Sequence, residues 1–93
     1  MKVADDYMEP AIDALLEIAQ RENPYQNKDM LRVEACDFLL ANVDPDDPRW
    51  DTVFAIVERF ASGKTPTETG VRIRALKLVI THAISEIANL KGA

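Results

Sequence analysis

The sequence predicts an all-α protein of four helices, arranged as two tandem antiparallel helical hairpins. Three observations predict this fold. Apolar residues recur every three to four positions in four segments, which is the spacing of amphipathic helices. No segment shows the strict alternation of apolar and polar residues that marks a strand. The two halves of the chain also carry matching apolar patterns, about 40 residues apart.

The first predicted helix covers residues 7 to about 22. Its buried face consists of residues that recur at helical spacing: Met8, Ala11, Ile12, Leu15, Leu16 and Ala19. Asp5 or Asp6 is expected to cap it, which places Pro10 in or near the first turn, where its missing N–H matters little. The helix should end at Asn23–Pro24, because a residue before proline disfavours the α conformation.

The next two helices lie on either side of the stretch DPDDPRW. Asn27 or Asp29 should cap the second helix, which runs to about Val43. Asp47 followed by proline predicts the cap and first residue of the third helix. Glycine is the usual residue just past a helix, so Gly63 marks the end of the third helix.

The fourth helix is predicted to start at the capping box 65–68, TPTE, and to reach Gly92, about 24 residues further on. A chain of 93 residues makes one domain. We therefore expect a single helical domain over 1–93, with hairpin one at about 5–43 and hairpin two at about 48–91.

The internal repeat relates DMLRVEACDFLLANV, from Asp29, to TGVRIRALKLVITHA at an offset of 40, and AIDALLEIA, from Ala11, to TVFAIVERF at an offset of 41. Arg32 and Arg72 coincide in this alignment. The period is that of HEAT-type repeats, and segments 28–35 and 68–75 resemble the start of that family's second helix, with an aliphatic residue, arginine and small residues. The resemblance implies a stack of two units. Solenoids usually have three units or more and shorter loops, so a four-helix bundle is the alternative.

The fourth predicted helix has two apolar stripes. The broad one is expected to face the core: Ile73, Leu76, Val79, Ile80, Ala83, Ile84, Ile87 and Leu90. The second stripe lies on nearly the opposite side and recurs on the second helix: Val71, Ala75 and Leu78, matched by Leu31, Ala35 and Phe38. Two stacked units cover one second stripe and leave the other open. We expect the open one on the fourth helix, as a homodimer contact or a site for another protein.

No constellation of residues predicts catalysis, a metal or a cofactor. His82 is the single histidine and aligns with the second stripe, so it is expected to be an interface side chain. Cys36 is the single cysteine and is expected to pack in the core. Asp44, Asp46 and Asp47 lack the ligand pattern of a calcium loop and indicate a turn with a helix cap. Trp50 is expected to anchor the core or, if exposed beside these acids, an interface.

The net charge of −5 is divided unevenly. Residues 1–63 hold six basic and fourteen acidic side chains, a net of −8, whereas residues 64–93 hold five basic and two acidic ones, a net of +3. Direct nucleic-acid binding is not expected of an acidic chain. The asymmetry instead suggests head-to-tail contact or a basic partner. The sequence offers no membrane span and has acids where a signal peptide is apolar, which predicts a cytoplasmic protein.

The function expected from these patterns is that of a small, non-catalytic protein–protein interaction module. It would bind a protein partner or itself through an apolar helix stripe or through the acidic face. The alternative is an acidic inhibitor, such as phages encode, that occupies the basic nucleic-acid-binding groove of an enzyme. Binding by charge mimicry should weaken steeply with salt, and apolar contact should not.

Overall fold

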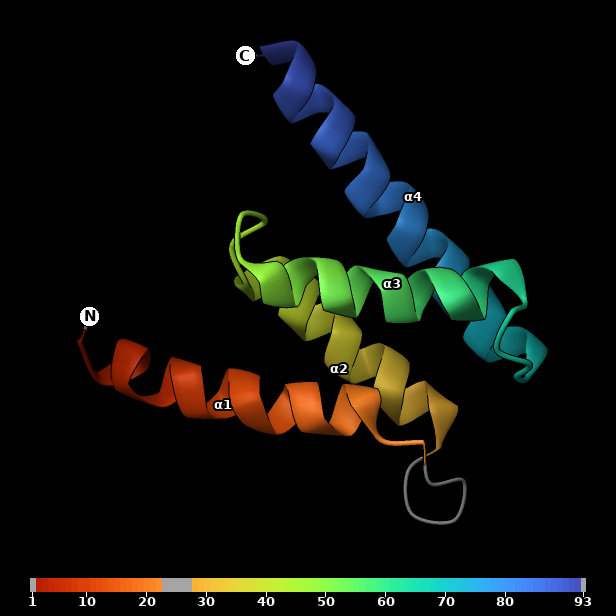
Figure 1. Ribbon diagram of the computed structural model, residues 1–93, viewed down its shortest axis with the longest axis horizontal. Helices are drawn as coiled ribbons and strands as arrows, with labels where there is room; N and C mark the ends of the chain where they lie inside the picture. The colour runs from red at the N-terminus through yellow and green to blue at the C-terminus, as the bar shows by residue number, and fades with distance from the viewer. Residues whose placement is uncertain (1, 23–27, 93) are drawn as a thin grey trace.

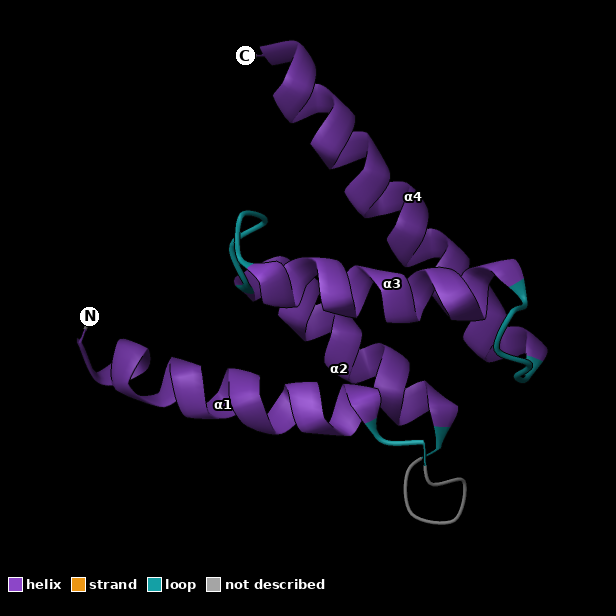
Figure 2. Ribbon diagram, in the orientation of Figure 1, coloured by secondary structure: helices purple, strands orange, loops and turns teal. Residues whose placement is uncertain are grey.

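The computed structural model describes residues 2–22 and 28–92, and the side chains of 7–22 and 28–83. The described chain is composed of four helices, without a strand (Figure 2). They are α1 (Lys2–Gln20), α2 (Asp29–Asn42), α3 (Pro48–Ser62) and α4 (Thr69–Gly92). The predicted all-α class and the number of helices are confirmed.

The helices form two hairpins, α1–α2 and α3–α4, and the second hairpin repeats the course of the first (Figure 1). In this view α3 runs in the direction of α1, and α4 in the direction of α2. Helix α2 packs against all three other helices, whereas α1 and α4 share no contact in the described part of the chain. A closed four-helix bundle would bring the first and last helices together. The two hairpins therefore stack side by side and leave the stack open at both ends.

The core lies where α2 meets its three neighbours. The largest fully buried side chains come from α2 and α3: Phe60, Leu39, Val33, Val53, Val57 and Cys36. Removing such a side chain from water contributes roughly 1.5–3 kcal/mol each. Trp50 is buried at the start of α3 and donates its indole N–H to the carbonyl of Leu40, 3.2 Å away. This bond fixes the start of α3 against the end of α2, as expected of a core anchor.

Two predicted helix starts are wrong. Helix α1 begins at Lys2, before the predicted caps, and Pro10 lies in its interior. The proline removes one backbone hydrogen bond, and the helix continues on both sides of it. Asp29 is the first residue of α2, and its N-cap, Lys28, makes no side-chain capping bond. The Asp29 carboxylate instead accepts a hydrogen bond of 2.7 Å from the hydroxyl of Thr67, in the loop before α4.

The predicted cap and end of α3 are confirmed, and the predicted start of α4 is wrong. Asp47 caps α3 by accepting the backbone N–H of Arg49 at 2.9 Å. Gly63 ends the helix with a φ of 85°, the left-handed conformation that favours glycine. The capping box predicted over 65–68 is wrong, because α4 starts only at Thr69. Thr67, inside the predicted box, donates its hydroxyl hydrogen bond to Asp29 of α2, which is a tertiary contact.

Among the described residues, none of the helices has the length and apolar character needed to cross a membrane.

Candidate protein-interaction surface

Each hairpin is closed by a hydrogen bond of the same kind between equivalent residues. Arg32 Nε donates to the carbonyl of Ala19 at 3.0 Å, and Arg72 Nε donates to the carbonyl of Ala61 at 2.9 Å. Each arginine is the fourth residue of the second helix of its hairpin, and each carbonyl belongs to the last residue but one of the first helix. Carbonyls at the end of a helix lack partners within the helix, so the arginine satisfies one of them. The sequence repeat is thus also a repeat of structure.

The surroundings of the two arginines differ. Arg32 is buried, and its guanidinium carbon lies 5.0 Å from the ring centre of Phe60, on α3. Arg72 is exposed. A cation over an aromatic ring is stabilised by the ring's electron density, more so when it is shielded from water. Hairpin two therefore covers the closing bond of hairpin one, while its own closing bond stays at the open end.

The apolar side chains of α2 and α4 show the same difference. Three residues of α2 are buried, with exposed fractions of 0, 0 and 4%: Val33, Cys36 and Leu40. Their repeat counterparts on α4 are 47, 40 and 57% exposed: Ile73, Leu76 and Ile80. These three α4 residues, spaced three and four apart, form one helix stripe, which we call the α4 end face. This face is apolar and exposed, whereas the equivalent positions of hairpin one are buried in the stack.

The expected faces of α4 are therefore wrong. Val71, Ala75 and Leu78, predicted to form the open stripe, are at most 5% exposed and belong to the core. The residues of the α4 end face were predicted to be core. Of the rest of that broad stripe, Val79 and Ala83 are half-buried, and Ile84, Ile87 and Leu90 lie outside the described side chains. The physical reason is that α4 packs against α3 and α2 with its narrower stripe in the core, which leaves Ile73, Leu76 and Ile80 uncovered.

Helix α2 has the matching arrangement at the other end of the stack. Leu31 and Phe38 are 53 and 39% exposed, whereas their counterparts, Val71 and Leu78, are in the core. Ala35, between them, is buried. We call Leu31 and Phe38 the α2 end face. The open stripe was expected on the fourth helix and is found on the second helix instead, at Leu31 and Phe38, so that expectation is wrong.

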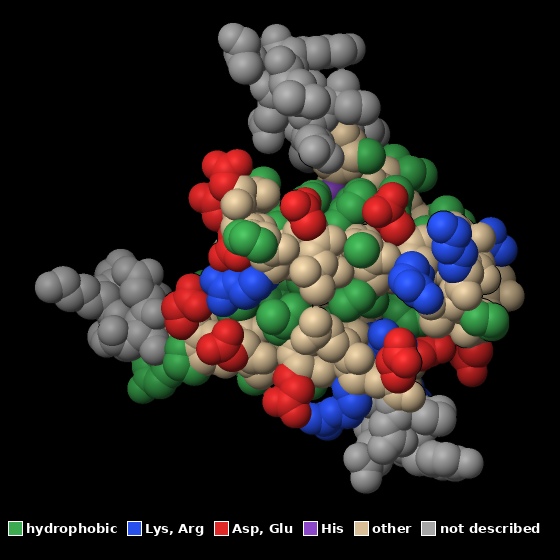
Figure 3. Space-filling model, viewed as in Figure 1, with side chains coloured by type: hydrophobic (Ala, Val, Ile, Leu, Met, Phe, Trp, Pro, Cys, Tyr) green, Lys and Arg blue, Asp and Glu red, His purple; other side chains and the backbone are tan. Residues whose placement is uncertain are grey.

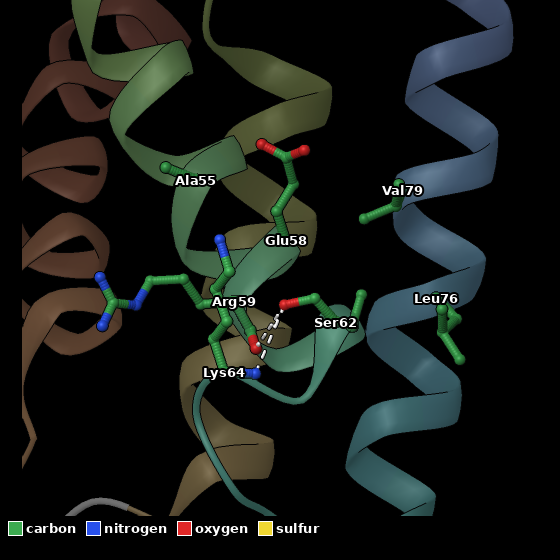
Figure 4. A pocket seen from close by; sticks show the side chains of 8 residues that line it. Ala55, Glu58, Arg59, Ser62, Lys64, Leu76 and Val79 are labelled. Carbon is green, nitrogen blue, oxygen red and sulfur yellow. Dashed lines mark hydrogen bonds between the residues drawn. The ribbon is translucent and has the colours of Figure 1, made fainter.

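A groove opens between α3 and α4 beside the α4 end face (Figure 4). Its volume is about 530 Å³. Leu76 and Val79 form its α4 wall, and charged side chains of Glu58, Arg59 and Lys64 lie around it. An apolar wall with charged residues nearby resembles the centre and rim of a protein interface.

An ionic contact joins α2 and α4 along the side of the stack. Arg74 pairs with Glu34, at 3.2 Å, and with Asp37. This contact was not predicted from the sequence. One signal was present: in the alignment, Glu34 stands opposite Arg74 and Asp37 opposite Lys77, so the two helices carry opposite charges at equivalent positions.

A second ionic cluster joins α1 to the start of α3. Arg49 lies 3.0 Å from Glu9, 3.6 Å from Asp13 and 2.7 Å from Asp47. Hydrogen bonds from Arg49 hold the pKa of Asp47 and of Glu9 below their usual values, and the two carboxylates raise the pKa of Arg49. Asp47 is thus a helix cap and an ion-pair partner, and it shares the single positive charge of Arg49 with Glu9 and Asp13.

The other candidate residues are separated from the end faces. Asp44 and Asp46 are exposed in the turn between the hairpins, where Asp44 accepts the backbone N–H of Asp46 at 2.9 Å. Trp50 is buried and stacks on Phe54, and the half-buried His82 meets it edge-on, with ring centres 6.1 Å apart. Trp50 is therefore no surface anchor.

Cys36 is fully buried, as predicted, and burial raises the pKa of its thiol to about 12. Its counterpart in the repeat, Leu76, was also expected in the core but is exposed, so the repeat position alone does not explain the burial of Cys36. Within residues 7–22 and 28–83, no three His, Cys, Asp or Glu side chains come together in a group that could hold a metal ion.

The chain matches no protein-family model, no curated protein and no solved structure.

Proposed function

We propose that this protein is a small, non-catalytic protein–protein interaction module that binds through the α4 end face. The observation that carries the proposal is the pairing of positions in the repeat. Val33, Cys36 and Leu40 are covered by the stack, and the same positions of hairpin two are apolar and open. Contiguous exposed apolar surface on a small protein marks a contact site.

The acidic face supports binding less well than the apolar one. Five of the acidic side chains that would have to present charge to a basic groove already pair with arginines within the chain. Arg49 pairs with Glu9, Asp13 and Asp47, and Arg74 pairs with Glu34 and Asp37. On the face shown in Figure 3, acidic side chains are spread out and lie next to basic ones at several places. An inhibitor that mimics nucleic acid presents negative charge without interspersed basic groups, so we favour the apolar contact.

Site-specific photo-crosslinking tests the proposal. A photoreactive phenylalanine analogue replaces Ile80 in the α4 end face, Asp46 in the acidic turn, or Thr52, an exposed residue of α3 that serves as control. The variants are irradiated in cells that normally contain the protein, and the adducts are identified by mass spectrometry. We expect a protein adduct from position 80 that forms at high salt in extracts as well, because apolar contact is weakly screened.

The three positions separate the outcomes. An adduct from position 46 alone, lost at high salt, would favour the acidic inhibitor. Equal labelling from positions 80 and 52 would mean that the α4 end face is ordinary surface and would overturn the proposal.

A further inference from the structure

We propose that the occupant of the α4 end face is the α2 end face of a second copy of this chain, which continues the stack head to tail. The inference rests on the proposed function, since it names the partner for the same surface. Head-to-tail contact of this kind repeats the interface that already joins hairpin one to hairpin two within the molecule.

The apolar residues of the internal interface have counterparts on both end faces. Inside the molecule, the α2 positions of Val33, Cys36 and Leu40 are buried together with the α4 positions of Val71 and Leu78. In a contact between two copies, Ile73, Leu76 and Ile80 of the first copy take the places of Val33, Cys36 and Leu40. Leu31 and Phe38 of the second copy take the places of Val71 and Leu78. Both sets are apolar and exposed, so each end face supplies what the other lacks.

The charges beside these faces are also complementary. In the molecule, Arg74 reaches from α4 to Glu34 and Asp37 on α2. In the repeat, Glu34 is the counterpart of Arg74, and Lys77 is the counterpart of Asp37. Continued stacking therefore places Glu34 of the second copy against Arg74 and Lys77 of the first. The signs are exchanged, but opposite charges still meet.

A two-fold contact between two α4 end faces would not bring opposite charges together. Two α4 end faces packed on each other bring Lys77 of one copy towards the basic residues of the other. Like charges across an interface are repelled, which suppresses the wrong pairing. The charge division of the chain, −8 over residues 1–63 and +3 over 64–93, favours the head-to-tail arrangement in the same way.

The test uses one variant for each end face. Phe38→Glu disables the α2 end face and Ile80→Glu disables the α4 end face, and both side chains are exposed enough for the variants to fold. Leu31→Glu and Ile73→Glu repeat the test at neighbouring positions, and circular dichroism confirms the fold of each variant. Sedimentation velocity then measures mass up to about 0.5 mM, which detects contacts as weak as roughly millimolar.

We expect the wild type to grow in mass with concentration beyond a dimer, because a head-to-tail contact does not close on itself. Each variant alone should be a monomer. An equimolar mixture of the two should form a dimer and nothing larger, since one intact α4 end face meets one intact α2 end face. Lys77→Glu should weaken assembly about fivefold at low salt and less at high salt.

Two results would overturn the inference. A Phe38→Glu variant that still dimerises by itself would show a two-fold contact through the α4 end face. A wild type that stays monomeric over the whole range would exclude the second copy as occupant. In that case an adduct from position 80 with a different protein leaves the proposed function standing, and the absence of any adduct removes both.

Discussion

The two hairpins of this protein share a fold, a closing hydrogen bond and an apolar pattern, yet equivalent residues have opposite environments. Cys36 is fully buried on α2, and Leu76 at the same position of α4 is 40% exposed. Leu78 is buried on α4, and Phe38 at the same position of α2 is exposed. Each second helix has two apolar stripes, and its place in the stack determines which of them is covered. The burial of a residue here depends on its neighbour, and its own helix pattern does not fix it.

The largest difference is expected between Cys36→Asp and Leu76→Asp. Cys36→Asp buries a charge without a partner and should lower the free energy of unfolding by about 3–5 kcal/mol, much of the total for a domain of this size. Leu76→Asp places the same group at the open end and should cost about 1 kcal/mol or less. Urea denaturation followed by circular dichroism measures both. Equal losses would contradict the difference between the hairpins.

The thiol of Cys36 gives an independent check on the same position. Its pKa is raised from 9.0 to about 12, so the folded state holds the proton more tightly than the unfolded state does. The stability that this neutral thiol contributes is present below pH 9 and is lost as the pH rises towards 12. A bulky thiol reagent should therefore label the native protein only as fast as it opens, and immediate labelling would place Cys36 at the surface.

The second comparison concerns Leu78, which is buried on α4, and Phe38, which is exposed at the same position of α2. Leu78→Ala should destabilise the protein by about 2–4 kcal/mol, because it leaves a cavity in the core. Phe38→Ala should cost about 1 kcal/mol, although phenylalanine is the larger side chain, since Phe38 is partly in water. Thermal denaturation at one protein concentration ranks them. A greater loss from Phe38→Ala would mean that hairpin one is the better packed at this position.

The third comparison concerns the two closing arginines. Arg32→Met keeps most of the apolar stem but removes the donor to the carbonyl of Ala19, and should cost about 2 kcal/mol because the site is covered by Phe60. Arg72→Met removes the same bond where water can replace it, and should cost about 0.5–1 kcal/mol. Hydrogen exchange at the ends of α1 and α3 gives a local readout for each variant. Similar losses would show that Phe60 does not shield the bond between Arg32 and Ala19 from water.

The smallest effect is expected in the ionic contact between α1 and α3. Lowered pKa values of Glu9 and Asp47 mean that their pairing with Arg49 contributes stability above the ordinary values of 4.5 and 3.8. This contribution is lost as the pH falls below these values and through the lowered ones, where the carboxylates take up protons. Arg49→Met should therefore make the unfolding midpoint less dependent on pH in the acid range. An unchanged pH dependence would show that the cluster adds no stability.

The four helices, their order as tandem hairpins and the caps at Asp47 and Gly63 could be predicted from the sequence. These follow from local spacing and turn chemistry, which act within a few residues. Helix starts were less predictable. Asp29 was a predicted capping residue, and its carboxylate instead bonds to the hydroxyl of Thr67 in the other hairpin. A side chain with two possible partners cannot be assigned from one segment of the chain.

Only the tertiary structure decided which apolar stripe of each second helix is exposed. Both stripes of α4 are apolar, and the broader one looked like the core because it contains more large side chains. The choice depends on α3 and α2, the helices that α4 packs against: Val71, Ala75 and Leu78 are buried, and Ile73, Leu76 and Ile80 are left uncovered. Helical periodicity reports that a face is apolar, but the free energy of covering it is gained only from the element that packs there. That element belongs to another part of the fold, so the pattern of one helix cannot identify it.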